Sequence, residues 1–259
     1  MQAIAREMNL SETVFVQKPT SNRALARLRI FTTTQELPLA GHPVVGTWFL
    51  LAELGVVPAR DGAVHVMQQT GAGVLPVEIE FRSGRPFRVT TIQRPARFRA
   101  ARMSRARLAD ALGLRLADFD RALPIQSVSA GVWMLMVPLR SRVALRRIRS
   151  NPQALNVALG GRDTVAYCFA LGSRGKAFAR GMLPWGLVED PATGSAAGPL
   201  GCYLVKHGRL DAGKGLDVLQ GVEMGRPSQI HVQVMRSGKL LVPRVSGSAV
   251  RVLEGTIDA

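Results

Sequence analysis

The sequence contains few of the residues that build disulfide frameworks and metal centres. Its 259 residues include two cysteines and four histidines. A disulfide framework needs several cysteines at close spacing, and a zinc site needs more ligands than these scattered side chains supply. Cys168 and Cys202 each lie among apolar residues, so we expect two buried thiols and no metal site.

Long apolar runs are also missing. The best candidate, residues 44–57, is interrupted by Thr47, Glu53 and two glycines. A helix that crosses a bilayer needs about 18 or more apolar residues. Residues 1–10 contain Arg6 and Glu7 and have no apolar central segment, so no signal peptide is indicated. The sequence therefore predicts a soluble, cytoplasmic protein without a membrane partner.

Acidic residues are scarce relative to basic ones, 18 against 34, which gives a net charge of +16. Such a charge raises the question of nucleic-acid binding. The arginines are spread along the chain, however, and the densest stretches, 82–107 and 140–149, lack the interleaved aromatic residues of a single-strand stacking platform. We interpret them as a solvated basic surface that attracts anionic substrates, and we do not expect nucleic acid as the partner.

Short segments of alternating apolar and polar residues predict many strands. In the first half we expect strands at residues 13–16, 24–32, 63–69, 74–80 and 87–93. In the second half we expect them at residues 125–129, 132–137, 164–170, 176–182, 216–220, 229–235, 240–245 and 249–253. One helix is expected to end near residue 8, and another to begin after Ser104. Residues 118–124 are the best boundary, giving an N-terminal lobe at 1–120 and a C-terminal lobe at 121–259.

Two segments of the sequence resemble each other. Residues 41–55 and 194–208 both run from glycine to glycine, open with a polar residue and then become nearly all apolar. A final glycine is typical of a helix C-terminus, and a helix that is apolar on every side is a buried helix. The sequence therefore predicts an α+β protein of two similar lobes, each with strands wrapped around one central helix.

The starts of these two helices are candidate binding positions. A helix N-terminus presents free backbone N–H groups and the positive end of the helix dipole, and a glycine there lets an anion approach closely. Gly41-His42 and Gly194-Ser195 fit this description and could hold a carboxylate. Ordinary capping, with Pro43 in the first turn, explains the same residues and stays open as the alternative.

Two acidic residues are candidates for proton transfer. Glu12 interrupts an apolar junction between a turn and a strand, and burial there would raise its pKa toward the range of a general acid or base. Asp190 lies just before the second glycine-led helix. The plainer alternatives are an exposed glutamate at a strand edge and an aspartate that only caps the helix.

Five strings of the sequence resemble the phenazine-biosynthesis isomerase-like (PhzF-type) family. They are residues 1–13, 36–43, 189–196, 220–228 and 247–250, and together they extend over essentially the whole chain. The resemblance implies the diaminopimelate-epimerase-like fold, with two lobes that each form a strand barrel around a central helix. This agrees with the two buried helices predicted above.

The resemblance also implies an activity. Family members catalyse a cofactor-independent proton shift between carbon atoms of a small amino or hydroxy carboxylic acid, in the cleft between the lobes, and are commonly homodimers. At the positions that match the family, Glu12 would carry the proton, and His42 and Asp190 would assist its movement. The substrate carboxylate would bind at Gly41, Gly194 and Ser195. The family lacks the paired catalytic cysteines of the epimerases. Its members have a further N-terminal segment, so we expect the first lobe here to lack its first strands.

Two other classes of function are weighed against the isomerase. A catalytically inactive protein on the same fold would bind a small molecule without turning it over, because a fold does not guarantee chemistry. A nucleic-acid binder would show an affinity that falls steeply with salt.

Overall fold

The computed structural model describes residues 1–173, 175–185 and 188–257. The chain forms two compact units, which are described separately. Unit 1 contains Met1–Ile92 and the chain from Ser246 onward, and unit 2 contains Gln93–Val245. Residues 93–120, expected in the N-terminal lobe, thus lie in unit 2. The reason is that strand β7 (Arg97–Ala100) pairs with β8 (Gln126–Ser129), which takes this part of the chain into the second sheet.

Unit 1 is built from two helices and a mainly antiparallel sheet. The helices are α1 (Gln2–Met8) and α2 (Gly41–Glu53). The strands are β1 (Thr13–Gln17), β2 (Ala26–Phe31), β3 (Glu36–Leu37), β4 (Gly62–Thr70), β5 (Gly73–Arg82) and β6 (Arg85–Ile92). They are ordered β1-β2-β4-β5-β6, with β3 beside β2, and only the β2–β4 pair is parallel among the pairings described within this unit.

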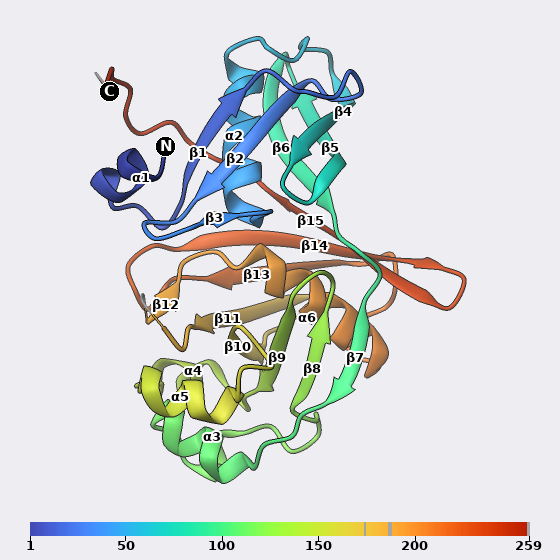
Figure 1. The fold of residues 1–259 in the computed structure, drawn as a ribbon. Coiled ribbons are helices and arrows are strands. Elements are labelled where there is room, and N and C mark those ends of the chain that lie inside the picture. The colour runs from blue at the N-terminus through green and yellow to red at the C-terminus, as the bar shows by residue number, and fades with distance from the viewer. Residues whose placement is uncertain (174, 186–187, 258–259) are drawn as a thin grey trace. The chain divides into compact units, whose positions relative to one another are not determined.

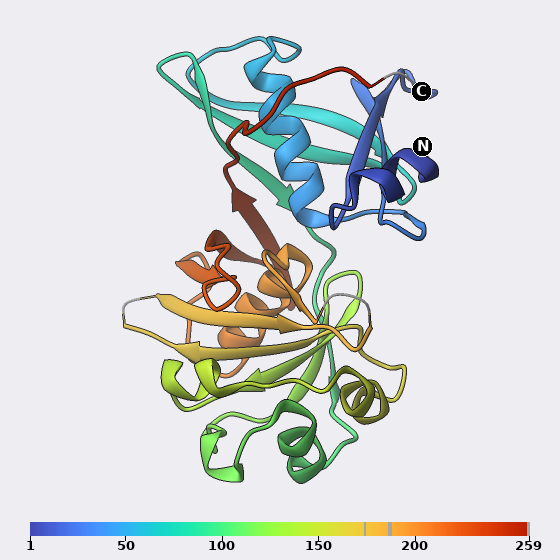
Figure 2. The same ribbon diagram turned by 90° about the vertical axis from the view of Figure 1, so that its left-hand side faces the viewer.

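The core of unit 1 forms between α2 and the strands that surround it (Figure 2). Alternate residues of β2, such as Leu28 and Ile30, turn inward and are 1% exposed, as the period of two in a strand requires. Trp48 of α2 is fully buried, and its indole nitrogen donates a hydrogen bond of 2.9 Å to Oε1 of Gln68 on β4. The polar edge of the largest core side chain is therefore satisfied.

Unit 2 contains a longer sheet and more helices. The helices are α3 (Arg105–Leu112), a 3-10 turn (Leu116–Asp118), α4 (Arg142–Arg147), α5 (Pro152–Leu159) and α6 (Gly194–Lys206). Besides β7 and β8, the strands are β9 (Trp133–Pro138), β10 (Ala166–Leu171), β11 (Lys176–Met182), β12 (Glu189–Asp190), β13 (Gly215–Gln220), β14 (Ser228–Ser237) and β15 (Leu240–Gly247). Their order is β7-β8-β9-β10-β11-β13-β14-β15, with β12 beside β11.

The sheet of unit 2 is covered on both faces (Figure 1). On β9, Met134 and Met136 pack with α6, whereas Leu135 and Val137 pack with α3, α4 and α5. Since successive side chains of a strand point to opposite faces, strands buried on both faces are apolar at nearly every position. This explains the uninterrupted apolar sequence of β9 and β10.

Helices α4 and α5 were not predicted, although their caps are visible in the sequence. Oγ of Ser141 accepts a hydrogen bond from the Ala144 N–H, and Oδ1 of Asn151 accepts one from the Ala154 N–H. These are ordinary N-cap bonds. The strand predicted at residues 249–253 is wrong: residues 248–257 have no regular structure, and Val250 and Val252 are more than four-fifths exposed.

The two central helices, α2 and α6, agree with the prediction from the two glycine-led segments. Each begins at the predicted glycine and has 13 residues. Neither these nor any other helix of the described residues is long and apolar enough to cross a membrane. Unit 1 and unit 2 thus each contain one buried helix surrounded by strands, as the sequence led us to expect.

A matched pair of glycine substitutions tests how closely these helices pack. A Cβ on Gly201 of α6 would lie 2.7 Å from Cγ1 of Val232 and 3.0 Å from Cγ2 of Val234, whereas a Cβ on Gly46 of α2 would meet nothing within 4 Å. We expect Gly201→Ala to lower the free energy of unfolding by about 1–3 kcal/mol through overpacking. Gly46→Ala should raise it by about 0.5–1 kcal/mol, because alanine loses less entropy in a helix. Urea denaturation measures both, and equal effects would contradict the difference in packing.

Candidate active site

Glu12 and His42 form the best-defined cluster of predicted site residues. Glu12 precedes β1, and His42 is the second residue of α2. Oε2 of Glu12 lies 2.8 Å from Nε2 of His42, so the two form an ion pair when the imidazole is protonated. Their side chains are 16% and 33% exposed, respectively. The structure therefore brings together two residues that are 30 positions apart in the chain (42 − 12).

The segment that leads into α2 is fixed by the turn between β4 and β5. The Ala72 N–H donates a hydrogen bond of 3.0 Å to the Pro38 carbonyl. A Cβ on Gly71 would lie 2.8 Å from Cα of Pro38. Any larger residue at position 71 would push this segment away, and with it the helix start that carries His42.

The pKa of Glu12 differs from the expectation. Burial is the largest influence and raises the pKa of this carboxyl, as the sequence suggested. The hydrogen bond and charge of His42, with a hydrogen bond from Ser11, outweigh it and leave the pKa below the ordinary value of 4.5. The prediction of a raised pKa was wrong because it considered burial without the partner. Glu12 is therefore a carboxylate at neutral pH.

Thr13, next to Glu12, carries a polar atom without a partner. Its Oγ1 is buried, and no hydrogen bond reaches it from the described residues. Oε2 of Glu12 is buried as well, and its described contact is the His42 nitrogen. An unsatisfied buried polar atom costs about 1–3 kcal/mol, and such costs are typical of functional sites.

The two predicted helix starts have the same local form. Gly41 is the first residue of α2, after the N-cap Ala40, and Gly194 is the first residue of α6, after the N-cap Thr193. Neither N-cap side chain accepts a hydrogen bond from its helix. At α6 the Gly194 and Ala196 N–H groups donate instead to the Ala192 and Thr193 carbonyls, at 3.0 and 2.9 Å. Ordinary capping therefore stays open as the alternative to ligand binding at these starts. Ser195, the second residue of α6, is half-buried.

Asp190 lies in unit 2, in the tight turn that enters α6. Its Oδ1 accepts a hydrogen bond of 3.2 Å from the Ala192 N–H, and its Oδ2 accepts one of 2.8 Å from Oγ1 of Thr193. Both carboxylate oxygens thus help to form the turn, as an aspartate side chain often does. This geometry gives Asp190 a structural part in the turn before α6, and its role in proton transfer stays a prediction.

A buried glutamine that the sequence analysis missed holds this turn in place. Gln220 ends β13 and is fully buried. Its Oε1 accepts hydrogen bonds from the Tyr167 hydroxyl (2.8 Å) and the Thr193 N–H (3.2 Å). Its Nε2 donates to the Asp190 carbonyl (2.7 Å) and to Oγ1 of Thr193 (2.8 Å). Burial and the charge of Asp190 raise the pKa of Tyr167, so its hydroxyl remains a donor. The side-chain amide of Gln220 thus accepts two hydrogen bonds and donates two, the full number that such a group can make.

A buried ion pair supports the same turn from the other side. Arg180 of β11 donates two hydrogen bonds to the Glu189 carboxylate, of 3.0 and 2.6 Å, and both residues are 8% exposed. Its remaining terminal nitrogen donates to the carbonyls of Leu145 and Ile148, at 3.1 and 3.3 Å. A buried charge pair is stable only with such full hydrogen bonding. Glu189 is the neighbour of Asp190, so the pair fixes the backbone there.

The two cysteines are buried thiols, as predicted. Burial raises the pKa of each to about 12, so neither is a thiolate at neutral pH. Cys168 lies in β10 and Cys202 in the middle of α6, away from the helix starts. Among residues 1–173, 175–185 and 188–257, no three or more His, Cys, Asp or Glu side chains form a group that could hold a metal ion.

Comparisons with known proteins agree with this architecture. A family model described as phenazine biosynthesis-like protein matches residues 1–255. The chain is 38% identical over 259 residues to a trans-2,3-dihydro-3-hydroxyanthranilate isomerase from Pseudomonas chlororaphis, covering 99% of this chain and 87% of that protein. The crystal structure of a PhzF family protein from Bacillus anthracis is similar, with a TM-score of 0.86, 28% identity and coverage of 96% of this chain and 85% of that one.

The fold extends to more distant proteins. A probable proline racemase from Agrobacterium radiobacter matches 98% of this chain and 81% of its own, with a TM-score of 0.68 at 12% identity. Such an identity shows the fold alone. The diaminopimelate-epimerase-like fold predicted from the sequence is confirmed. The chain belongs to the phenazine biosynthesis-like family, and it is an isomerase of that family.

The effect of His42 on Glu12 predicts a pH shift of known sign. In the wild-type protein, the pKa of Glu12 lies below 4.5 because His42 outweighs burial. His42→Leu removes the charge and the hydrogen bond but keeps an apolar side chain, so burial should then raise this pKa above 4.5. A carbon-13 NMR titration of the labelled glutamate carboxyls measures both values. His65→Leu, on the exposed face of β4, is the control and should leave Glu12 unchanged; a lower pKa in His42→Leu would contradict the account.

Gln220 should be important for stability. Gln220→Leu leaves the Tyr167 hydroxyl, the Thr193 N–H and the Asp190 carbonyl without their partner. At about 1–3 kcal/mol for each unsatisfied group, we expect a loss of about 3 kcal/mol or more in the free energy of unfolding. Urea denaturation measures it against Gln229→Leu, an exposed position on β14. Equal stability of the two variants would mean that the network around Gln220 contributes little.

Proposed function

We propose that this chain is a cofactor-independent isomerase that moves a proton between carbon atoms of a small amino or hydroxy carboxylic acid, with Glu12 as the group that carries the proton. The observation that supports this most is the half-buried Glu12–His42 pair at 2.8 Å. A carboxylate with a lowered pKa begins the reaction as a base.

The proton shift then has two steps. The Glu12 carboxylate takes a proton from a C–H group that an adjacent carbonyl or double bond acidifies, and the electron pair of that bond moves into the conjugated system. The protonated Glu12 returns the proton to a different carbon, which leaves the carboxylate as it began. His42 lies close enough to stabilise the Glu12 carboxylate before the first step and after the second.

The helix starts are proposed to bind the substrate carboxylate. Gly41 at the start of α2, and Gly194 with Ser195 at the start of α6, precede helices whose first N–H groups receive no side-chain cap. The positive end of the helix dipole favours an anion there. At α6 the Gly194 N–H donates to the Ala192 carbonyl at 3.0 Å, so a bound carboxylate would have to replace that partner or rely on the dipole and the Ser195 side chain. The Oγ1 of Thr13, buried without a partner among the described residues, is a further candidate to bind a polar group of the substrate.

Several features of this proposal come from the sequence and stay predictions. They are the assisting role of Asp190, the homodimer and the cytoplasmic location. A further prediction is that one substrate contacts both the Glu12–His42 pair and the residues at the start of α6. Asp190→Asn keeps two polar atoms in the turn and removes the charge. It should therefore leave the fold intact, and a rate loss without a stability loss would support a part for Asp190 in the reaction.

The second candidate function is a binding protein without turnover. The scarcity of acidic residues leaves a net charge of +16, which suits the capture of small anions whether or not they react. The two candidates differ in one observable property, because only an isomerase exchanges a carbon-bound proton of its ligand with solvent.

Exchange of deuterium from solvent tests the proposal. The first compound to try is trans-2,3-dihydro-3-hydroxyanthranilate, which appears in the name of the similar isomerases. Other small amino and hydroxy acids follow. We expect the wild-type protein to incorporate deuterium into one of them, and Glu12→Gln to lose about 10²-fold or more of that rate. Proton NMR measures the exchange.

Glu36→Gln is the matched control, because Glu36 is an exposed acid of the same unit that pairs with Arg29. It should exchange at the wild-type rate. Exchange that survives in Glu12→Gln would exclude Glu12 as the proton carrier. Binding of a compound by the wild-type protein without any exchange would favour the binding protein.

A further inference from the structure

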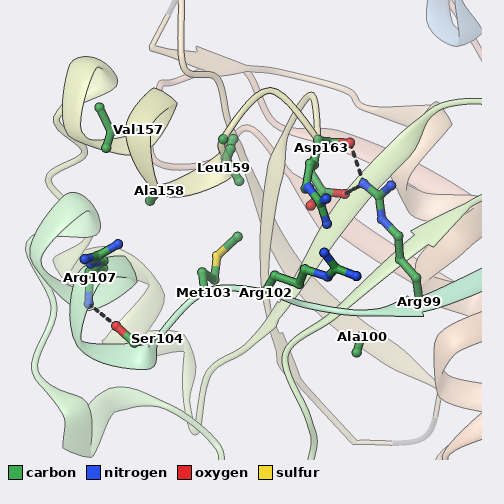
Figure 3. Close-up of a pocket in the computed structure, with 12 residues that line it drawn as sticks. Arg99, Ala100, Arg102, Met103, Ser104, Arg107, Val157, Ala158, Leu159 and Asp163 are labelled. Atoms are coloured by element: carbon green, nitrogen blue, oxygen red, sulfur yellow. Dashed lines mark hydrogen bonds and ion pairs between the residues drawn. The ribbon is translucent and has the colours of Figure 1, made fainter.

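A pocket in unit 2 that contains none of the candidate active-site residues is lined by arginines. Its cavity measures about 240 Å³, and four of its twelve lining residues are arginines while one is acidic. The arginines are Arg99, Arg102, Arg107 and Arg162, and the acid is Asp163. Strand β7, the start of α3 and the end of α5 contribute the walls (Figure 3).

The acid of the pocket is already engaged. Asp163 is 4% exposed; its Oδ2 accepts a hydrogen bond of 2.9 Å from the Ser127 hydroxyl, and its Oδ1 accepts one of 3.3 Å from Arg99. Arg99 also donates to the Arg162 carbonyl at 2.6 Å, and its guanidinium lies 4.1 Å from the centre of the Trp133 ring. Arg99 and Asp163 thus form a rigid wall of the pocket.

The other cations lack such partners. Across the described residues, the guanidinium groups of Arg102 and Arg107 make no ion pair or hydrogen bond, and both side chains are exposed. In Figure 3 the Arg102 side chain extends toward the part of the view that contains Arg99 and Asp163. Positive charge is therefore concentrated here, with four arginines against the single acidic residue Asp163.

Part of the lining is apolar. It consists of Met103, Val157, Ala158 and Leu159. Of these, Leu159 is 2% exposed and Val157 is 77% exposed, so the wall runs from the core of α5 out to the surface. A cavity lined by both cations and apolar side chains fits a compact molecule that has an anionic end and a small carbon skeleton.

We propose that this pocket is a second binding site, for a small multivalent oxyanion of the phosphate class. The planar guanidinium fork matches the oxygens of phosphate, and an arginine without a partner is well suited to bind them in pairs. Inorganic phosphate and pyrophosphate are the smallest members of the class, and a phosphate ester of a small metabolite would also use the apolar wall. The proposal concerns unit 2 alone and does not depend on the isomerase activity.

Titration calorimetry with pyrophosphate tests the proposal, at an ionic strength kept constant with sodium chloride. We expect saturable binding at one site per chain in the wild-type protein. The double variant Arg102→Gln/Arg107→Gln should bind about tenfold or more weakly, because each lost charged hydrogen bond contributes about that factor. Both side chains are exposed, so the variant should fold.

The matched control is Arg209→Gln/Arg236→Gln, which removes two exposed arginines of the same unit outside the pocket. It should bind as the wild-type protein does. Equal weakening in both double variants would mean that only the overall charge attracts pyrophosphate. Absence of saturable binding in the wild-type protein would overturn the proposal.

Chemical modification gives a second readout that needs no variant. Phenylglyoxal reacts with accessible arginines, and mass spectrometry locates the modified residues. Pyrophosphate should protect Arg102 and Arg107 but not Arg209 or Arg236. Equal modification of all four with and without pyrophosphate would contradict a site in this pocket.

Discussion

A helix that is apolar on every side has to be covered on every side, and this requirement shapes both units of the chain. Strands surround α2 in unit 1, and in unit 2 α6 packs against the sheet through Ala196, Leu200 and Tyr203. Gly41 and His42 at the start of α2 and Ser195 at the start of α6 are half-buried, so a ligand could reach them. The predicted site residues lie at or near these two helix starts, where the helix dipole favours anions.

The electrostatics of Glu12 depend on this arrangement. A carboxylate at a half-buried junction would be driven toward its neutral form by burial alone. The start of α2 brings His42 within 2.8 Å, and the balance reverses. The same helix that forms the core of unit 1 therefore also sets the ionisation state of the residue proposed to carry the proton.

Much of the fold could be predicted from the sequence because its signals are local. The two glycine-led apolar segments identify α2 and α6, and the alternation in residues 176–182 predicts β11 with the bounds observed. Contacts between distant segments could not be predicted in the same way. Gln220 meets Tyr167 and Thr193 only because β13 lies parallel to β11 and α6 begins beside it, and nothing near Gln220 in the sequence indicates this. The lowered pKa of Glu12 was missed for the same reason, since its cause lies 30 positions away (42 − 12).

The central claim is that Glu12 faces the reacting carbon of a bound acid. A crystal structure of the wild-type protein with a substrate, or with an unreactive analogue of it, tests this most directly. The account predicts that the carbon that loses its proton lies about 3–3.5 Å from a carboxylate oxygen of Glu12, a distance suited to reaction, with the ligand carboxylate at a helix start. A ligand bound with Glu12 turned away from it, or bound far from Glu12, would contradict the account.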